Sequence, residues 1–302
     1  MIYESPAALE MAIKAAAKVS PCDTNKAIAA FYLHRFLYRI FMENNHAFVL
    51  KGGRAMLART LDARATRDID LLSKLDTLNE ALEYVKQLSQ VNTGDFITFE
   101  FLNWHPIKAN DEYRNGINMH FLSIIGAKPT QTISIDLVVD TIPLEDIERI
   151  TPVDRINVQG LPVCDYLVYP VESALADKLC ALFETYQGIP SSRVKDLVDI
   201  VVYARVSNID GAKLQNRIHH EAKMRKLTLG QKFTLPTSWG KNHASQFAKL
   251  CAQTQLPKSL WNLEAACQLA SALFDPAMQN NAHNLYWSSI QLKWLHKTTI
   301  TS

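Results

Sequence analysis

The sequence predicts an α+β protein in which a mixed sheet with flanking helices is followed by a helical C-terminal half. Runs of alternating apolar and polar residues, the pattern of half-buried strands, occur between about residues 48 and 140. From Pro170 onward the apolar residues recur at helical spacing instead. We therefore expect a sheet-containing domain at residues 1–165 and a mainly helical domain at residues 166–302.

The first elements are expected to be helices, because residues 5–44 place apolar side chains at helical spacing as far as Asn44. A short apolar run from Phe48 to Leu50 predicts a strand that enters a glycine turn, and residues 55–61 predict a helix. The segment RDIDLLS then alternates apolar and acidic residues as a strand does. Three further strands are expected at FITFEF, INMHFLSII and TISIDLVV.

The composition, with 48% hydrophobic and 21% charged residues in 302, is typical of a soluble globular protein. No apolar run reaches the roughly 20 residues of a membrane helix, and the first residues carry acids without an apolar signal core. The sequence thus favours a cytoplasmic protein without a membrane partner. Its five cysteines include no CxxC pair, which indicates reduced structural thiols and speaks against a zinc site.

A glycine turn and a carboxylate pair form the first candidate site. Lys51, Gly52 and Gly53 follow the first strand, and Asp68 and Asp70 lie on the second. Two glycines let backbone N–H groups approach a triphosphate, and a helix that starts beyond them adds the positive end of its dipole. Aspartates at i and i+2 of a strand point to the same face, where their oxygens can hold Mg²⁺. Such an ion neutralises the charge that develops as pyrophosphate leaves a nucleoside triphosphate.

A third carboxylate lies in the run TISIDLVVD. Ile133, Ile135 and Leu137 face one side of the expected strand, which leaves Asp136 on the other. A charge on an inner strand requires a partner or a function. Asp140 at the strand end is the competing candidate, and a turn residue is the ordinary interpretation of its position.

Two expected helices after Pro170 form the second candidate site. YPVESALADKLCALFETY buries an apolar stripe and leaves Lys178 outside it. SSRVKDLVDIVVYAR starts at a Ser cap and carries Arg193, Asp196 and Asp199 along one side. Taken alone, both segments fit ordinary amphipathic helices with ion pairs.

Together these motifs resemble the DNA polymerase β nucleotidyltransferase superfamily, and within it the AbiE-type toxins, which include AbiEii and MenT-like proteins. The resemblance lies in KGGRAMLARTLDARATRDIDLL, followed by PVESALADKLCAL and RVKDLVDI, and it covers at least residues 48–204. It implies a polymerase β-like mixed sheet, Mg²⁺ as cofactor and a nucleoside triphosphate (NTP) as substrate. One position departs from the superfamily, which has Ser or Thr after the glycine pair where this chain has Arg54. An arginine would contact phosphate with a different geometry.

The resemblance also implies roles for single residues. Asp68, Asp70 and Asp136 would hold the metal, and Asp136 would alternatively take the proton of the attacking hydroxyl. Lys178 would stabilise the triphosphate, while Asp196 would activate the acceptor or hold Lys178 in position. Asp199 is expected to be a structural partner. The expected nucleotide-binding residues are Lys51, Gly52, Gly53, Arg54, Thr66 and Lys178.

A basic segment, residues 211–260, contains nine Lys or Arg and one acid, Glu221, which indicates either a polyanion-binding surface or a solvated face. Its candidate RNA contacts are Lys223, Arg225 and Lys226. The resemblance implies the toxin of a type IV toxin–antitoxin, abortive-infection system that modifies RNA, at the 3′ end of tRNA, and so blocks translation. An AbiEi-like antitoxin would be its partner. The helical domain would complete the active site and bind the RNA.

Two alternatives stay open. One keeps the chemistry but makes a protein hydroxyl the acceptor, and the basic segment argues mildly against it. The other is a nucleotide-binding or RNA-binding protein that has lost catalysis. The joint presence of Asp68, Asp70, Lys178 and Asp196 speaks against the second alternative.

Overall fold

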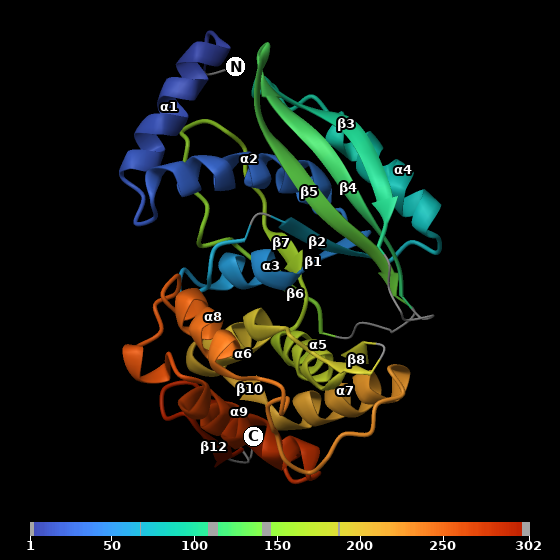
Figure 1. The fold of residues 1–302 in the computed structure, drawn as a ribbon. Helices are drawn as coiled ribbons and strands as arrows, with labels where there is room; N and C mark the ends of the chain where they lie inside the picture. Colours follow the sequence, from blue (N-terminus) through green and yellow to red (C-terminus); the bar gives the residue numbers. More distant parts are fainter. Residues whose placement is uncertain (1–2, 67, 108–113, 141–145, 187, 298–302) are drawn as a thin grey trace, which may run out of the picture. The chain divides into compact units, whose positions relative to one another are not determined.

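The chain forms two compact units in the computed structural model, which describes residues 3–66, 68–107, 114–140, 146–186 and 188–297 (Figure 1). Unit 1 comprises Met1–Leu61 and Thr66–Tyr169, and unit 2 comprises Asp62–Ala65 and Pro170–Ser302. The division thus falls at Tyr169, shortly after the expected boundary at residue 165. Across the described ranges, no helix combines the length and the apolar composition that crossing a membrane requires.

Most helices of unit 1 lie in or near the segments that the apolar spacing predicts, but the helix after the first strand begins at Gly52 instead of residue 55, and the helix Leu78–Ser89 was not predicted. The helices of unit 1 are α1 (Pro6–Lys18), α2 (Thr24–Phe41), the 3-10 turn η1 (Met42–Asn44), α3 (Gly52–Arg59) and α4 (Leu78–Ser89). The start of α1 illustrates the local chemistry, because the Ser5 side chain accepts a hydrogen bond from the Ala8 N–H and Pro6 occupies the first turn.

A mixed sheet forms the centre of unit 1. Its strands are β1 (Phe48–Lys51), β2 (Asp68–Ser73), β3 (Ile97–Pro106), β4 (Arg114–Ile125), β5 (Lys128–Asp140), β6 (Glu148–Ile150) and β7 (Tyr166–Val168). Their order in the sheet is β3-β4-β5-β2-β1-β7-β6. β2 runs parallel to β5 and antiparallel to β1, so the predicted mixed sheet is confirmed.

The two faces of this sheet differ in chemistry. Ile69, Leu71, Ile135 and Leu137 are fully buried in the core of unit 1 on one face. Helices α2 and α4 pack against that face (Figure 1). The alternating residues of β2 and β5, including the aspartates, point to the other face, which we call the carboxylate face.

Unit 2 is mainly helical, as expected. Its helices are α5 (Val171–Phe183), α6 (Val194–Val206), α7 (Gly211–Met224), α8 (Lys241–Cys251), the 3-10 turn η2 (Lys258–Leu260) and α9 (Leu263–Met278). Its short strands are β8 (Thr185–Tyr186), β9 (Ile189–Pro190), β10 (Ile209–Asp210), β11 (Leu285–Ser288) and β12 (Lys293–His296).

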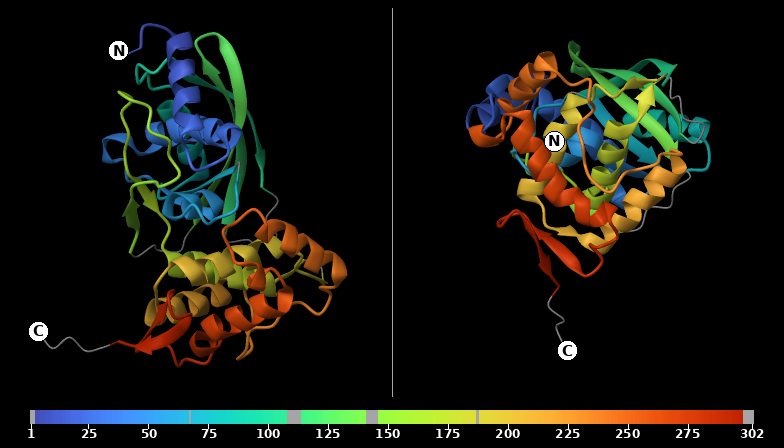
Figure 2. Two further views of the ribbon diagram at one scale, coloured as in Figure 1. Left: turned by 90° about the vertical axis from the view of Figure 1, so that its left-hand side faces the viewer. Right: turned by 60° about the horizontal axis from the view of Figure 1, so that its bottom comes forward.

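A small three-stranded sheet, β10-β11-β12, is an addition that the sequence did not predict. Its strands have two to four residues, which is too short for an alternating pattern to stand out. The sheet is anchored by Trp287, a buried residue whose indole N–H donates to the Ala204 carbonyl of α6 at 2.7 Å. The hairpin of β11 and β12 is visible near the end of the chain in Figure 2.

Candidate active site

The glycine turn of unit 1 lies directly against one of the predicted carboxylates. Gly52 begins α3 with a φ of 63°, a left-handed conformation that favours glycine. A Cβ atom at this position would lie 1.9 Å from Asp70 Oδ2. A Cβ at Gly53 would lie 3.1 Å from the Cβ and Cγ2 atoms of Thr66. The turn therefore lies close to Asp70 at Gly52 and to Thr66 at Gly53.

The three candidate metal ligands share the carboxylate face. Asp70 is directly opposite Asp136 in the parallel pairing of β2 and β5, and register partners in neighbouring strands point to the same side. Asp68, two residues earlier on β2, points the same way and is exposed. The amide of Asn118 on β4 donates to Asp136 Oδ1 at 2.6 Å, which fixes the orientation of that carboxylate. The competing Asp140 ends β5, and its side chain lies outside the described residues.

The residues of the carboxylate face fit a divalent ion for which the protein supplies only some of the ligands. No group of three or more His, Cys, Asp or Glu side chains within the described residues is close enough to enclose a metal ion. The side chains of Asp70 and Asp136 lie side by side on adjacent strands, beside a turn that has no side chain at Gly52. Mg²⁺ commonly takes one or two carboxylates together with phosphate and water oxygens. This part of the carboxylate face can therefore supply the protein ligands of such an ion.

The guanidinium of Arg54 is buried within unit 1 and paired with a carboxylate. Its side chain is 3% exposed, and its guanidinium donates to Asp154 Oδ2 at 2.7 Å and contacts His34 Nε2 at 3.1 Å. Burial raises the pKa of Asp154, but Arg54 and His34 outweigh it and lower that pKa to about 2. The predicted role of Arg54 as a nucleotide contact is not supported by this placement, because its charge is engaged in the core. Lys51, by contrast, pairs in register with Asp70 and places its Nζ 4.2 Å from the centre of the Tyr169 ring.

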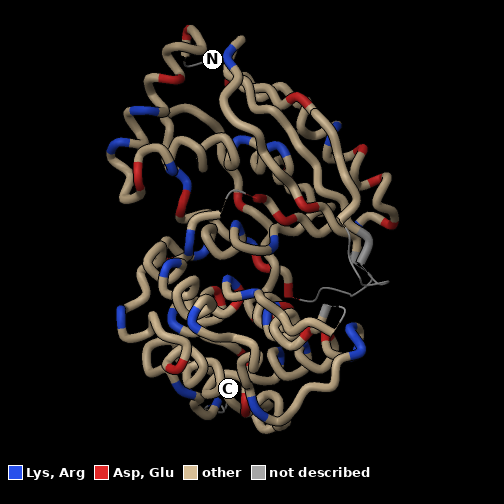
Figure 3. Tube along the Cα trace, viewed as in Figure 1, with Lys and Arg blue, Asp and Glu red and all other residues tan. Residues whose placement is uncertain are grey.

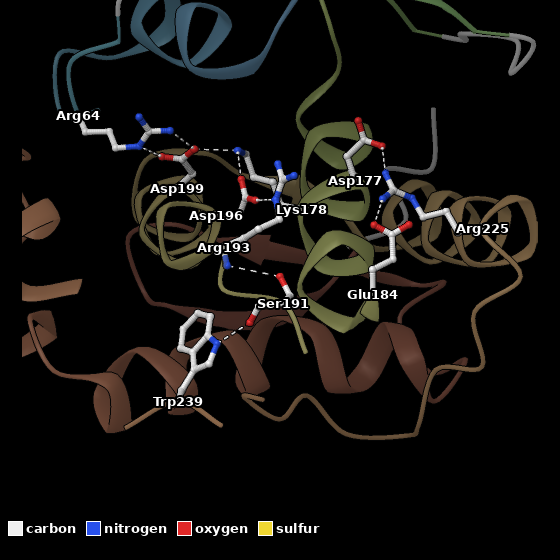
Figure 4. Close-up of polar contacts among 10 residues, drawn as sticks. All are labelled: Arg64, Asp177, Lys178, Glu184, Ser191, Arg193, Asp196, Asp199, Arg225 and Trp239. Carbon is white, nitrogen blue, oxygen red and sulfur yellow. Dashed lines mark hydrogen bonds and ion pairs between the residues drawn. The ribbon is translucent and has the colours of Figure 1, made fainter. Parts of the chain in front are cut away.

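Lys178 is the centre of a charged cluster in unit 2 (Figure 4). Its Nζ lies 2.7 Å from Asp199 Oδ2 and 3.1 Å from Asp196 Oδ1. Arg193 binds the second oxygen of Asp196, and Arg64 binds both oxygens of Asp199 at 2.9 and 3.1 Å. Lys178 and Asp196, both candidate site residues, are thus in contact, and Asp199 pairs with Lys178 and Arg64.

The charges of neighbouring side chains outweigh burial and determine the ionisation of Lys178 and Asp196. Burial lowers the pKa of Lys178, but the carboxylates of Asp199 and Asp196 outweigh burial and hold that pKa above its ordinary value. Burial raises the pKa of Asp196, whereas Lys178 and Arg193 together lower it to about 2. Both partners of the Lys178–Asp196 pair are therefore charged near neutral pH. The five side chains of the cluster carry three positive charges and two negative ones, which suits attraction of an anion.

Two arginines of this cluster were not assigned a role from the sequence. Arg193 has a recognisable signal, because it precedes Asp196 by three residues at the start of α6. Its side chain is 42% exposed, which makes it the most accessible cation of the five cluster side chains. Arg64 is separated from Asp199 by 135 residues, so its contact follows only from the fold.

The predicted RNA contacts divide into two kinds. Lys223 and Lys226 are exposed. Arg225 is instead almost fully buried and binds the carboxylates of Asp177 and Glu184 (Figure 4). It also binds the carboxylate of Glu221. The fully buried Glu221 requires cationic partners, which explains why an arginine of the basic segment turns inward. This placement does not support the predicted RNA contact of Arg225. Figure 3 shows the Lys and Arg residues of unit 2 spread over several of its helices.

The chain matches a family model described as nucleotidyl transferase AbiEii toxin, type IV toxin–antitoxin system, over residues 35–283. No curated protein matches it. Among solved structures it is similar to JHP933 from Helicobacter pylori, with 15% sequence identity and a TM-score of 0.45 over 86% of this chain and 95% of the other. A second H. pylori structure, described as a candidate nucleotidyltransferase, gives 16% identity and a TM-score of 0.41 over 85% and 96%. Since both TM-scores are below 0.5, neither structural similarity supports a conclusion about this chain, and its family follows from the family model alone.

Proposed function

We propose that this chain, which belongs to the AbiEii family of type IV toxin–antitoxin nucleotidyltransferases, transfers a nucleoside monophosphate from an NTP to a hydroxyl group of RNA. One observation carries the proposal within unit 1. The glycine turn at Gly52 lies against Asp70, and Asp70 lies opposite Asp136 on the neighbouring strand. This adjacency supports the proposal, because a glycine turn can bind phosphate and carboxylates can hold the metal ion that phosphoryl chemistry uses.

The reaction assigns a task to each of these groups. The oxygen of the acceptor hydroxyl attacks the α-phosphorus, and the bond from that phosphorus to the bridging oxygen of the β-phosphate breaks, so pyrophosphate leaves. The proton of the hydroxyl passes to the Asp136 carboxylate, which Asn118 holds in place. The N–H groups of the glycine turn bind phosphate oxygens, with Lys51 and Thr66 beside them. Asp68, Asp70 and Asp136 would hold Mg²⁺, which supplies positive charge against the phosphates when bound.

The residues of unit 2 have proposed roles of their own. We propose that Lys178 contacts the triphosphate and that Asp196 holds Lys178 in position, a role that its 3.1 Å contact supports. The family further suggests the 3′ end of tRNA as the acceptor, since a nucleotide added there would prevent aminoacylation and stop translation. It also implies an antitoxin partner, for which an AbiEi-like protein is our candidate.

A labelling experiment tests this function. Purified protein is incubated with each labelled NTP, total RNA and either Mg²⁺ or a chelator, and we expect label in RNA only with Mg²⁺ present. Asp70→Asn should reduce transfer by about 100-fold or more, because it removes a charged ligand beside the phosphates. Asp76→Asn, which changes an exposed aspartate shortly after β2, is the matched control and should transfer normally.

Three outcomes would contradict the proposal. Label in protein instead of RNA would favour the alternative acceptor. Full transfer by Asp70→Asn would remove the carboxylates from the mechanism. Unchanged transfer in the chelator would remove Mg²⁺ from it.

A further inference from the structure

The carboxylate face continues beyond the metal-binding residues toward the edge strand β3. The strand registers connect His105 to Asn118, Asn118 to Asp136, Asp136 to Asp70 and Asp70 to Lys51. These five side chains form one row across β3, β4, β5, β2 and β1. Polar side chains on β4 and β3 therefore continue the row that contains Asp70 and Asp136.

A second row runs beside the first. It connects Asn103, His120, Ser134 and Asp68 through the same strand pairings. His120 Nδ1 lies 3.0 Å from Asn103 Oδ1, and the rings of His105 and His120 are 6.2 Å apart, edge to face. The histidines thus belong to one cluster, which we call the histidine patch: Asn103, His105, Asn118 and His120.

A β-bulge in β3 puts these residues on the carboxylate face. The register with β4 shifts between Phe101 and Asn103, so the alternation of side chains reverses there. Without the shift, Leu102 and Trp104 would point to the carboxylate face in place of Asn103 and His105. The irregularity thus replaces two apolar side chains by polar ones on the face that carries Asp136.

The chemistry of transfer determines which substrate lies over the histidine patch. The attacking and leaving oxygens are roughly in line through the phosphorus. The glycine turn, which receives the triphosphate, follows β1 and lies on one side of Asp70, whereas Asp136 and then β4 and β3 lie on the other. The leaving pyrophosphate therefore occupies the β1 side, and the acceptor hydroxyl approaches from the β5 side.

We propose that the histidine patch is the subsite for the terminal nucleoside of an RNA acceptor. This inference rests on the proposed function. Imidazole rings stack on bases, and the amides of Asn103 and Asn118 offer donors and acceptors for base edges and ribose hydroxyls. The exposed His105 and Asn103 reach the nucleoside, while the half-buried His120 is oriented by Asn103. A cluster of two imidazoles and two amides, with no Lys, Arg, Asp or Glu among its four residues, suits a nucleoside better than a phosphate or a charged peptide.

The test separates acceptor binding from nucleotide binding. His105→Ala and His120→Ala are made singly and together, and Thr98→Ala at the other end of β3 serves as the control, since Thr98 is exposed on the same face. Rates are measured against RNA concentration at saturating NTP and against NTP concentration at saturating RNA. We expect the double variant to raise the KM for RNA by about tenfold or more, a size typical of losing a stacked base. The KM for NTP and the parameters of Thr98→Ala should stay within about twofold.

Each of the other possible outcomes would overturn the proposed subsite. An RNA KM that stays within about twofold in the double variant, with normal transfer by the parent protein, overturns the subsite and leaves the proposed function intact. Equal increases in the KM for RNA and for NTP assign the patch to the nucleotide and overturn the subsite. Label on protein instead of RNA overturns both.

Discussion

Gly52 and Asp70 approach so closely that no side chain fits between them. A Cβ at residue 52 would overlap the carboxylate, at 1.9 Å from Oδ2, and the backbone there has a left-handed φ of 63°. The strand that carries the aspartate and the turn at the start of α3 therefore have a fixed mutual position. Glycine is required here for two separate reasons, the backbone conformation and the space for a carboxylate.

Gly52→Ala should for this reason abolish transfer and weaken the fold. The left-handed conformation costs an L-residue about 1–2 kcal/mol, and the Asp70 side chain must move to make room. Gly53→Ala is the matched control, because its Cβ would lie 3.1 Å from Thr66 and requires only a small adjustment. Transfer assays and chemical denaturation should show a clearly larger loss for Gly52→Ala. Equal losses in the two variants would contradict the special role of Gly52.

Lys178→Met should reduce transfer and also destabilise unit 2, because it leaves two buried carboxylates without the ammonium between them. Breaking a buried ion pair costs about 3–5 kcal/mol. The double variant Lys178→Met with Asp199→Asn removes one charge of each sign and should recover part of that stability. If transfer returns along with stability in the double variant, Lys178 has only a structural role. Continued loss of transfer in a stable protein would support its contact with the triphosphate.

Acid titration should reveal the ionised Asp196. Its folded pKa of about 2 is depressed below the unfolded value of about 4, so its contribution to stability is present above about pH 4 and is lost as the pH falls to about 2. The size of this contribution is about 2 kcal/mol. Asp196→Asn should therefore be less stable than the parent at neutral pH, and the gap should narrow by about this amount at pH 2. Denaturation curves over this range would show a constant gap if Asp196 were not ionised in the folded state.

The basic segment should respond differently at its exposed and buried cations. Replacing Lys223 and Lys226 with Gln should lower RNA affinity and reduce the log-log salt slope by roughly one unit per charge, if they contact phosphates. Arg225→Gln should instead destabilise the protein by about 3–5 kcal/mol, because it leaves the carboxylates of Asp177, Glu184 and Glu221 without their shared guanidinium. Binding isotherms at several salt concentrations, with denaturation curves, distinguish the two effects. An unchanged slope for the lysine variant would remove both lysines from the RNA surface.

Short-range patterns were sufficient to predict much of the fold. The alternation of Ile69 and Leu71 with aspartates follows from the two-residue period of a strand, and it indicates which side chains share a face. The neighbouring position of Asp136 was predicted from the same alternation in β5 and from the family resemblance. In each case the determining residues are close together in the sequence.

The partners of charged side chains could not be predicted in the same way. The sequence made Arg54 a candidate nucleotide contact and Arg225 a candidate RNA contact, but each is matched by carboxylates that are distant in the chain. The β-bulge at Leu102 was also missed, because a single extra residue in a strand leaves no mark on apolar periodicity. Only the paired strand reveals it, and with it the position of His105.

The short segment Asp62–Ala65 belongs to unit 2, although unit 1 precedes and follows it in the chain. A gene fragment that began at Pro170 would encode α5 to α9 but not Arg64, so Asp199 would lose both guanidinium hydrogen bonds. Unit 2 thus includes residues that lie between two parts of unit 1 in the sequence. Cutting the chain at one position therefore cannot give an intact copy of either unit. Recombination that exchanged only the part of unit 2 from Pro170 onward would break the Arg64–Asp199 pair. We therefore expect the two units to be inherited together.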